Sequence, residues 1–227
     1  MVVARRVAIL VIAAAVAALC VRLGFWQLDR LQERRAGNDR IRAGLAAAPV
    51  VLDVAPGSGA ALRRASAIGT YDVDGEVVLF GRALDGRSGD HLLTPLRLSD
   101  GSALLVDRGW VPTGTRSRAP EGEVEVRGFL LPPDSVDEAV PVSGRVTDVD
   151  PDGIGRTLPY ELAPVYLLLQ VQRPPAEGLP IPAPLPELSE GPHLSYAIQW
   201  FSFAAVALIG GAVLLRREGR VDDPVTE

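Results

Sequence analysis

Two apolar stretches, one near each end of the chain, constrain the fold more than any other feature. The first covers residues 7–26, in which Arg22 is the only charged side chain, and the second covers residues 194–215. At about 1.5 Å of rise per residue, roughly 20 residues cross the ~30 Å hydrocarbon core of a bilayer. The sequence therefore predicts two transmembrane helices that attach the segment between them to one face of a membrane.

The first stretch has an alternative reading as a cleaved signal. Arg5 and Arg6 precede the apolar run, and the sequence Ala-Ala-Leu-Cys ending at Cys20 is similar to a lipoprotein cleavage site. Cleavage sites need small residues, however, and Leu19 stands directly before the cysteine. The apolar run also continues past Cys20 to Trp26, so a retained helix is the preferred interpretation.

Arginines beside the two stretches give opposite indications of orientation. Three follow the second stretch, at Arg216, Arg217 and Arg220, whereas six lie near or after the C-terminal end of the first, at positions 22, 30, 34, 35, 40 and 42. Long segments are translocated largely regardless of charge, so the second stretch can set the orientation of the pair. We expect both termini in the cytoplasm and the central domain outside.

Composition indicates the cellular compartment and excludes one class of partner. All 23 basic residues are arginine, which suggests a GC-rich bacterial genome and hence a bacterial cell membrane. Residues 43–192 hold 21 acidic residues against 12 arginines, a formal charge of −9, so nucleic acid is not an expected partner. The single cysteine, Cys20, lies in the first apolar stretch, which leaves the central segment without a disulfide or a thiolate metal site.

The central segment has the pattern of a β domain. Short runs rich in Val, Leu and Tyr alternate with turn dipeptides such as Asp74-Gly75 and Asp100-Gly101. The predicted strands are residues 65–71, 76–82, 91–98, 103–107, 124–130 and 165–172. Their regular spacing favours a mainly antiparallel sheet that closes into a small barrel or a sandwich.

These patterns divide the chain into six segments. We predict a cytoplasmic N-terminus (1–6), a first transmembrane helix (7–28), an extracytoplasmic β domain (29–173), a proline-rich strap (174–192), a second transmembrane helix (193–215) and a cytoplasmic tail (216–227). Proline has no backbone N–H, so the strap is expected to stay out of the sheet ladder and to form a semi-rigid, polyproline-like connection.

Three motifs carry a resemblance to a known family. They are Leu-Gly-Phe-Trp-Gln-Leu-Asp-Arg (23–30), the pair Gly-Asp-His-Leu-Leu-Thr-Pro-Leu (89–96) and Leu-Val-Asp-Arg-Gly-Trp-Val-Pro (105–112), and His-Leu-Ser-Tyr-Ala-Ile-Gln-Trp-Phe (193–201). In this order, between two terminal helices, they resemble the surfeit-locus protein family of cytochrome c oxidase assembly factors. The resemblance implies a role in handing haem a to the catalytic subunit of the oxidase, or in stabilising that subunit while haem enters. Haem a synthase is a further partner in this reading.

The same resemblance assigns transient haem a binding to His193, the family histidine at the outer start of the second helix. A neutral imidazole is a good ligand for haem iron, and Tyr196 and Trp200 follow at helical spacing. On the first helix, Trp26 and Arg30 lie on one face with Arg22 and can contact the haem propionates. The plainer reading is that Tyr196 and Trp200 anchor the second helix at the membrane interface or pack against the first helix, and that Trp26 and Arg30 meet lipid phosphates.

The remaining motif residues admit two readings. Thr94, Pro95, Arg108, Gly109 and Trp110 either form a docking surface for the oxidase or have structural roles, with Arg108 paired internally beside a glycine turn that closes a strand. Gln27 is expected to bridge the two helices together with Gln199. His91, the other histidine, is expected to be structural.

Enzyme chemistry finds no support in the motifs. The sequence has no cysteine pair, no glycine-rich phosphate loop and only two histidines, so a non-enzymatic role is expected. Two functional classes remain. One is a haem-binding assembly factor, and the other is a membrane-tethered β domain that acts as a sensor or protein-binding scaffold.

Overall fold

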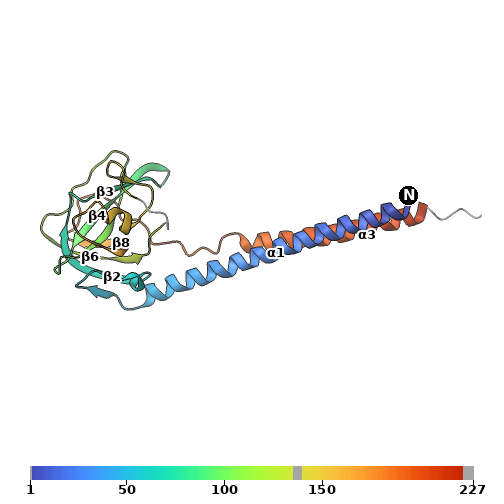
Figure 1. The fold of residues 1–227 in the computed structure, drawn as a ribbon, viewed down its shortest axis with the longest axis horizontal. Helices are drawn as coiled ribbons and strands as arrows, with labels where there is room; N and C mark the ends of the chain where they lie inside the picture. Colours follow the sequence, from blue (N-terminus) through green and yellow to red (C-terminus); the bar gives the residue numbers. More distant parts are fainter. Residues whose placement is uncertain (1, 135–139, 222–227) are drawn as a thin grey trace, which may run out of the picture. The chain divides into compact units, whose positions relative to one another are not determined.

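A computed structural model describes residues 2–134 and 140–221 (Figure 1). The chain forms two compact units, one made of Met1–Asp39 with Leu188–Glu227 and the other of Arg40–Glu187. The side chain of Arg220 and residues 222–227 of the expected tail lie outside the described residues.

The helical unit contains α1 (Val2–Ala46) and α3 (His193–Val221). Both are long and apolar enough to cross a membrane, which confirms the two predicted helices as candidate spans. The helix itself continues to Ala46, beyond the predicted transmembrane segment of residues 7–28. Apolar length sets only the part that fits a bilayer, whereas good helix formers such as Gln32, Glu33 and Arg34 continue the helix until the chain approaches Pro49.

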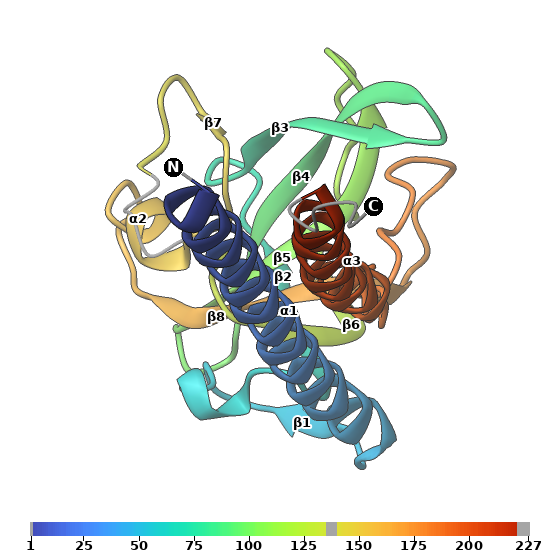
Figure 2. The same cartoon turned by 90° about the vertical axis from the view of Figure 1, so that its right-hand side faces the viewer.

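The two helices lie side by side in both views (Figures 1 and 2). Their contact buries Ala17 and Cys20 of α1 against Ala204 of α3. At Gly24 the approach is so close that an added Cβ would lie 2.7 Å from the Phe201 ring. Small residues at such positions let helices approach closely inside a membrane.

The sheet contains all six predicted strands. They are β2 (Arg64–Tyr71), β3 (Val77–Leu84), β4 (Arg87–Arg97), β5 (Ala103–Pro112), β6 (Glu123–Leu131) and β8 (Leu162–Arg173). The short elements β1 (Val50–Leu52), η1 (Ser58–Ala60), β7 (Arg145–Val146) and α2 (Pro151–Gly155) were not predicted. They are too short to give a periodic pattern, although Asp150 is a standard N-cap for α2, where it accepts a hydrogen bond from the Asp152 N–H.

The strands close into a barrel. Along the sheet β2 is followed by β6, β8, β5 and β4, and β4 then pairs back to β2 at Thr70–Arg97 and Tyr71–Leu96. Four of these five pairings are antiparallel, and the pairing of β5 with β8 is parallel. This confirms the mainly antiparallel domain and selects the barrel over the sandwich.

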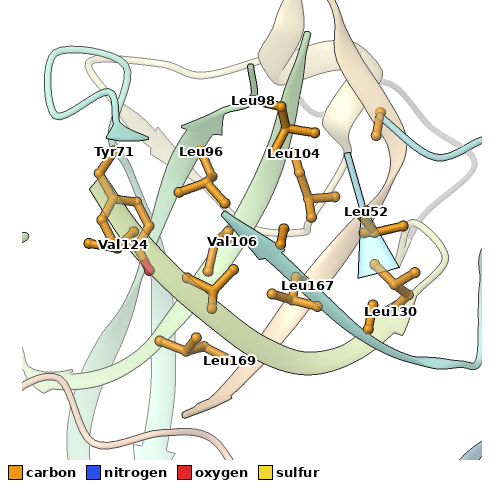
Figure 3. Close-up of a cluster of buried hydrophobic side chains, with 14 of the residues drawn as sticks. Leu52, Tyr71, Leu96, Leu98, Leu104, Val106, Val124, Leu130, Leu167 and Leu169 are labelled. Atoms are coloured by element: carbon orange, nitrogen blue, oxygen red, sulfur yellow. The ribbon is translucent and has the colours of Figure 1, made fainter. Parts of the chain in front are cut away.

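The barrel interior is filled by alternate side chains of its strands. Leu96, Leu104, Val106, Leu167 and Leu169 belong to this cluster, which Figure 3 shows. Because successive strand residues point to opposite faces, Leu105 and Tyr166 lie in a second cluster with residues of β3, β7 and α2. β5 is therefore buried on both faces.

The strap departs from the prediction. Ile181 forms an antiparallel bridge with Trp110 of β5, in which each N–H donates to the carbonyl oxygen of the other residue at 2.7 and 2.9 Å. The expectation that this tract stays out of the ladder is wrong because Ile181 keeps the backbone N–H that its proline neighbours lack. The Ser117 hydroxyl also donates to the Leu179 carbonyl, and Gln170 Nε2 donates to the Ala183 carbonyl.

Candidate functional site

The first residue of α3 is joined to α1 by a side-chain hydrogen bond. His193 is half-buried, and its Nδ1 lies 2.9 Å from Gln27 Oε1. Because a carbonyl oxygen only accepts, Nδ1 carries the proton and donates it to Gln27. Nε2 is then the lone-pair nitrogen, which is the form of imidazole that binds a metal. Gln27 therefore does bridge the helices as predicted, but its partner is His193 rather than Gln199.

The aromatic side chains after His193 divide between two environments. Tyr196 and Phe203 are exposed, with 47% and 46% of their surface accessible. Trp200 is half-buried and packs on the Ala17, Cys20 and Ala204 cluster. The rings of Trp200 and Phe203 meet edge to face, with centroids 5.8 Å apart. Trp200 thus packs between the helices, whereas Tyr196 and Phe203 are the rings of this group open to a ligand or lipid.

On α1, Trp26 and Arg30 form a stacked pair. The Arg30 guanidinium carbon lies 5.8 Å from the centre of the Trp26 ring, and the Trp26 side chain is 49% exposed. Arg30 also forms an ion pair of 2.8 Å with Glu33. The guanidinium is consequently partly neutralised and fixed beside the indole.

Two further contacts hold the chain just before α3 against α1. Arg35 forms an ion pair of 2.8 Å with Glu190, and Asn38 Nδ2 donates to the Ser189 carbonyl at 3.2 Å. Sequence reasoning missed both, because more than 150 residues separate the partners and neither pair has a motif. Together with Gln27 they make a continuous row of contacts that positions His193.

In the barrel, Arg108 is the centre of a buried polar network. Its Nη1 lies 3.0 Å from Glu76 Oε2, which also accepts a hydrogen bond from the Thr94 hydroxyl at 2.6 Å. Its Nη2 donates to the Arg118 carbonyl, and its guanidinium stands over the Tyr71 ring. Burial raises the pKa of the Tyr71 phenol well above its ordinary value. Arg108 is paired internally, in agreement with the structural reading.

The neighbouring Asp107 turns to the other face of β5. Its Oδ2 lies 2.8 Å from His91 Nδ1, and its Oδ1 accepts from the Gly109 N–H. His91 is thus held by a buried carboxylate. The expectation that a glycine turn closes the strand here is wrong, because β5 continues to Pro112 and Arg108 is an extra residue in the ladder with β4.

Gly109 lies opposite the strap, and this position explains why a residue without a side chain is needed there. Its φ of +116° is unfavourable for other residues, and an added Cβ would lie 2.1 Å from the Ile181 carbonyl oxygen. The other motif residues Thr94, Pro95, Arg108 and Trp110 are all buried. These side chains therefore do not form an exposed surface, and Gly109 and Trp110 are the two that meet the strap, at Ile181.

The fold and this geometry define a class of protein in which two candidate membrane-spanning helices flank a mixed-sheet β barrel, with a histidine at the start of the second helix. The sequence model of the SURF1 family matches residues 14–205. The chain belongs to the SURF1 family, the surfeit-locus family that its motifs resemble.

Individual relatives share the same description. An uncharacterised SURF1-like protein of Mycobacterium bovis is 29% identical over 202 residues, covering 82% of this chain and 73% of the relative. A SURF1-like protein of Rickettsia felis is 24% identical over 211 residues, covering 88% and 92%. A third, from Monosiga brevicollis, is 28% identical over 221 residues, covering 87% and 83%. The similarity extends over both helices and the barrel.

Proposed function

We propose that this protein is an assembly factor for cytochrome c oxidase in a bacterial cell membrane. Its role is to assist delivery of haem a to the catalytic subunit, or to stabilise that subunit while haem enters. Membership of the SURF1 family and the resemblance of three motifs to oxidase assembly factors support the proposal. The observation that carries it is the hydrogen bond between Gln27 and His193.

The residues around His193 fit haem as a transiently bound cargo. The Gln27 carbonyl keeps the proton on Nδ1 and so presents Nε2 as a ligand, which is how metal-binding histidines are usually oriented. His193 would hold the iron of a bound haem through this nitrogen, and the haem would give the protein its visible absorption.

Neighbouring side chains supply the remaining contacts. The exposed faces of Tyr196 and Trp26 offer apolar surface to a porphyrin ring, and Arg30 offers a guanidinium that can donate to a propionate. Glu33 and Trp26 hold Arg30 in place, so little rotamer freedom is lost on binding. Trp200 contributes by fixing the spacing of the helices.

The arrangement suits transfer of bound haem to a partner protein rather than catalysis of a reaction. In this proposal both termini are cytoplasmic and the barrel lies outside, so that His193 stands at the outer boundary of the bilayer. The partners are the catalytic subunit of the oxidase, haem a synthase as the source of haem, and the lipid bilayer. We assign no catalytic residue.

Deletion of the gene tests the proposal. The expected result is a lower haem a absorbance and lower cytochrome c oxidase activity, with b- and c-type cytochromes still present, and both should return with a plasmid copy of the gene. An unchanged haem a absorbance in the deletion strain would favour the alternative of a membrane-tethered sensor or scaffold unrelated to haem.

A further inference from the structure

A cavity of about 280 Å³ lies between the barrel and the proline-rich strap. Its lining includes Leu169, Gln170 and Gln172 of β8, Pro175, Pro180 and Pro182 of the strap, and Arg108 of β5. The cavity is independent of the helices that carry His193, since all of these residues belong to the barrel unit. The mouths of β-barrels are common places for small-molecule sites.

Two of the lining side chains keep a buried hydrogen-bond donor without an acceptor. Arg108 uses its Nη1 and Nη2 in the network with Glu76 and Arg118, but its Nε has no partner among the described residues. Gln172 accepts from the Tyr71 hydroxyl through Oε1, and its Nε2 likewise has no partner there. The two residues are 1% and 9% exposed. Buried donors are rarely left unpaired in folded proteins because the lost hydration is costly.

The chemistry of the lining indicates what would pair with them. Both unpaired groups are N–H donors, so the complementary group is an acceptor, and a guanidinium prefers a carboxylate. The prolines and Leu169 provide an apolar wall. The volume is near the lower end of the range of ligand pockets, ~300–1,000 Å³, which restricts the site to a small molecule.

We propose that this cavity binds a small monocarboxylate, whose oxygens accept from Arg108 Nε and Gln172 Nε2 and whose alkyl part packs on the strap prolines. Both nitrogens are covered from solvent, so the proposal requires the strap segment beside β8, residues 175–178, to move outward when the ligand binds. Gln170, which also lines the cavity, is already bonded to the carbonyls of Leu169 and Ala183 and takes no part in binding.

The test compares butyrate with its neutral isostere butyramide on the full-length protein in a nonionic detergent. The readout is the nitrogen-15 resonance of the Arg108 Nε–H and of the Gln172 side-chain amide. Butyrate should shift both resonances to saturation, and butyramide should not. Equal shifts with the two compounds, or no shift with either, would overturn the carboxylate assignment.

A pair of variants sharpens the result. Gln172→Met keeps the side-chain length but removes the donor, and should weaken butyrate binding about two- to tenfold, the effect of one hydrogen bond. Ile68→Ala, at an exposed position of β2 that does not line the cavity, should leave the affinity unchanged. Circular dichroism checks that both variants are folded. If Gln172→Met is not folded, the butyrate and butyramide titrations of the unmodified protein still decide the question.

Discussion

A single amide oxygen sets which nitrogen of His193 carries the proton. Gln27 lies on α1 and His193 on α3. The orientation of the imidazole therefore depends on how the two helices pack against each other. Groups of this kind, which hold a ligand without touching the metal, usually contribute roughly 10- to 100-fold to metal affinity. The role of Gln27 is therefore measurable separately from that of His193.

We predict that Gln27→Leu lowers haem a binding by roughly 10- to 100-fold, because the ring loses the group that fixes its tautomer and rotation. The control is Gln199→Leu, which changes the same residue type at an exposed position on α3. Titration of each purified variant with haem a, followed in the Soret region, measures the affinity. Equal losses in the two variants would assign the effect to general damage of the helix pair.

Three tyrosines of the barrel should make its stability sensitive to alkali. Burial raises the pKa of Tyr71 and Tyr166 above the ordinary value near 10, and Asp134 adds to the effect at Tyr166. For Tyr160 burial and the bond to Asp72 act in the same direction. The folded barrel therefore holds these protons more tightly than the unfolded chain. The stabilisation that results is fully present below about pH 10, near the ordinary pKa of tyrosine, and is lost as the pH rises further.

Urea unfolding at pH 9, 10 and 11, followed by near-ultraviolet circular dichroism, measures this loss. The sequence has no lysine, and Cys20 lies in α1, so the transition reports mainly on tyrosine. Tyr166→Phe should make the pH dependence shallower. A free energy of unfolding that stays constant between pH 9 and 11 would contradict the assignment.

At the scale of elements, the strap is joined to β5 by a backbone bridge. Ile181 pairs with Trp110 beyond the point where β8 accompanies β5, since the pairing of those two strands ends at Asp107 and Leu168. Gly109 makes this possible by leaving room for the Ile181 carbonyl. The motif Asp-Arg-Gly-Trp therefore couples the last segment before α3 to the barrel.

Gly109→Ala should destabilise the barrel by about 1–3 kcal/mol more than Gly114→Ala. Both glycines have positive φ, but an added Cβ at Gly114 meets nothing within 4 Å, whereas at Gly109 it meets the Ile181 carbonyl. Hydrogen exchange of the Ile181 amide should become faster only in Gly109→Ala. Similar behaviour of the two variants in both measurements would mean that strap pairing does not depend on Gly109.

Whether a feature could be predicted from the sequence depends on how far apart along the chain its interacting residues lie. All six long strands were predictable because alternating Val and Leu residues and Asp-Gly turns are local signals. The continuation of α1 to Ala46 was missed because helix length was inferred from apolar length. The bridge of Ile181 to Trp110 and the contact of Gln27 with His193 join residues that are far apart in the sequence, and no local pattern encodes such pairs.

The candidate site was predictable in part for the same reason. The motifs identified His193, Tyr196 and Trp26, and a helical period placed them on faces. Packing of Trp200 against the first helix was one of the two plainer readings and is confirmed, whereas the ion pair of Arg30 with Glu33 was not predicted. For the motif of β5 the sequence left two readings open, a docking surface for a partner and a structural role. The burial of its side chains favours the structural role.

At the scale of the whole molecule, the proposal requires one orientation. Arg216 and Arg217 follow the apolar part of α3, a position that favours a cytoplasmic C-terminus. The arginines that follow the apolar part of α1 argue for the reverse. The orientation is therefore the assumption that most needs a direct test.

Fusions to alkaline phosphatase provide that test, because the enzyme is active only outside the cytoplasm. A fusion at Gly144, in an exposed loop of the barrel, should be active, and a fusion after Glu227 should be inactive. A cytoplasmic reporter such as green fluorescent protein should give the opposite pattern at the same two positions. Active phosphatase at Glu227 with an inactive fusion at Gly144 would place the barrel in the cytoplasm and exclude the proposed route for haem.

The most direct measurement of the central claim is the absorption spectrum of three purified proteins, co-expressed with the enzymes of haem a synthesis. They are the unmodified chain, His193→Ala and His91→Ala. The account predicts that His193→Ala inserts normally but loses bound haem a or shifts its Soret band, whereas His91→Ala, whose imidazole pairs with Asp107 in the barrel, keeps the unmodified spectrum. Identical haem content and spectra in His193→Ala and the unmodified chain would contradict haem ligation by His193.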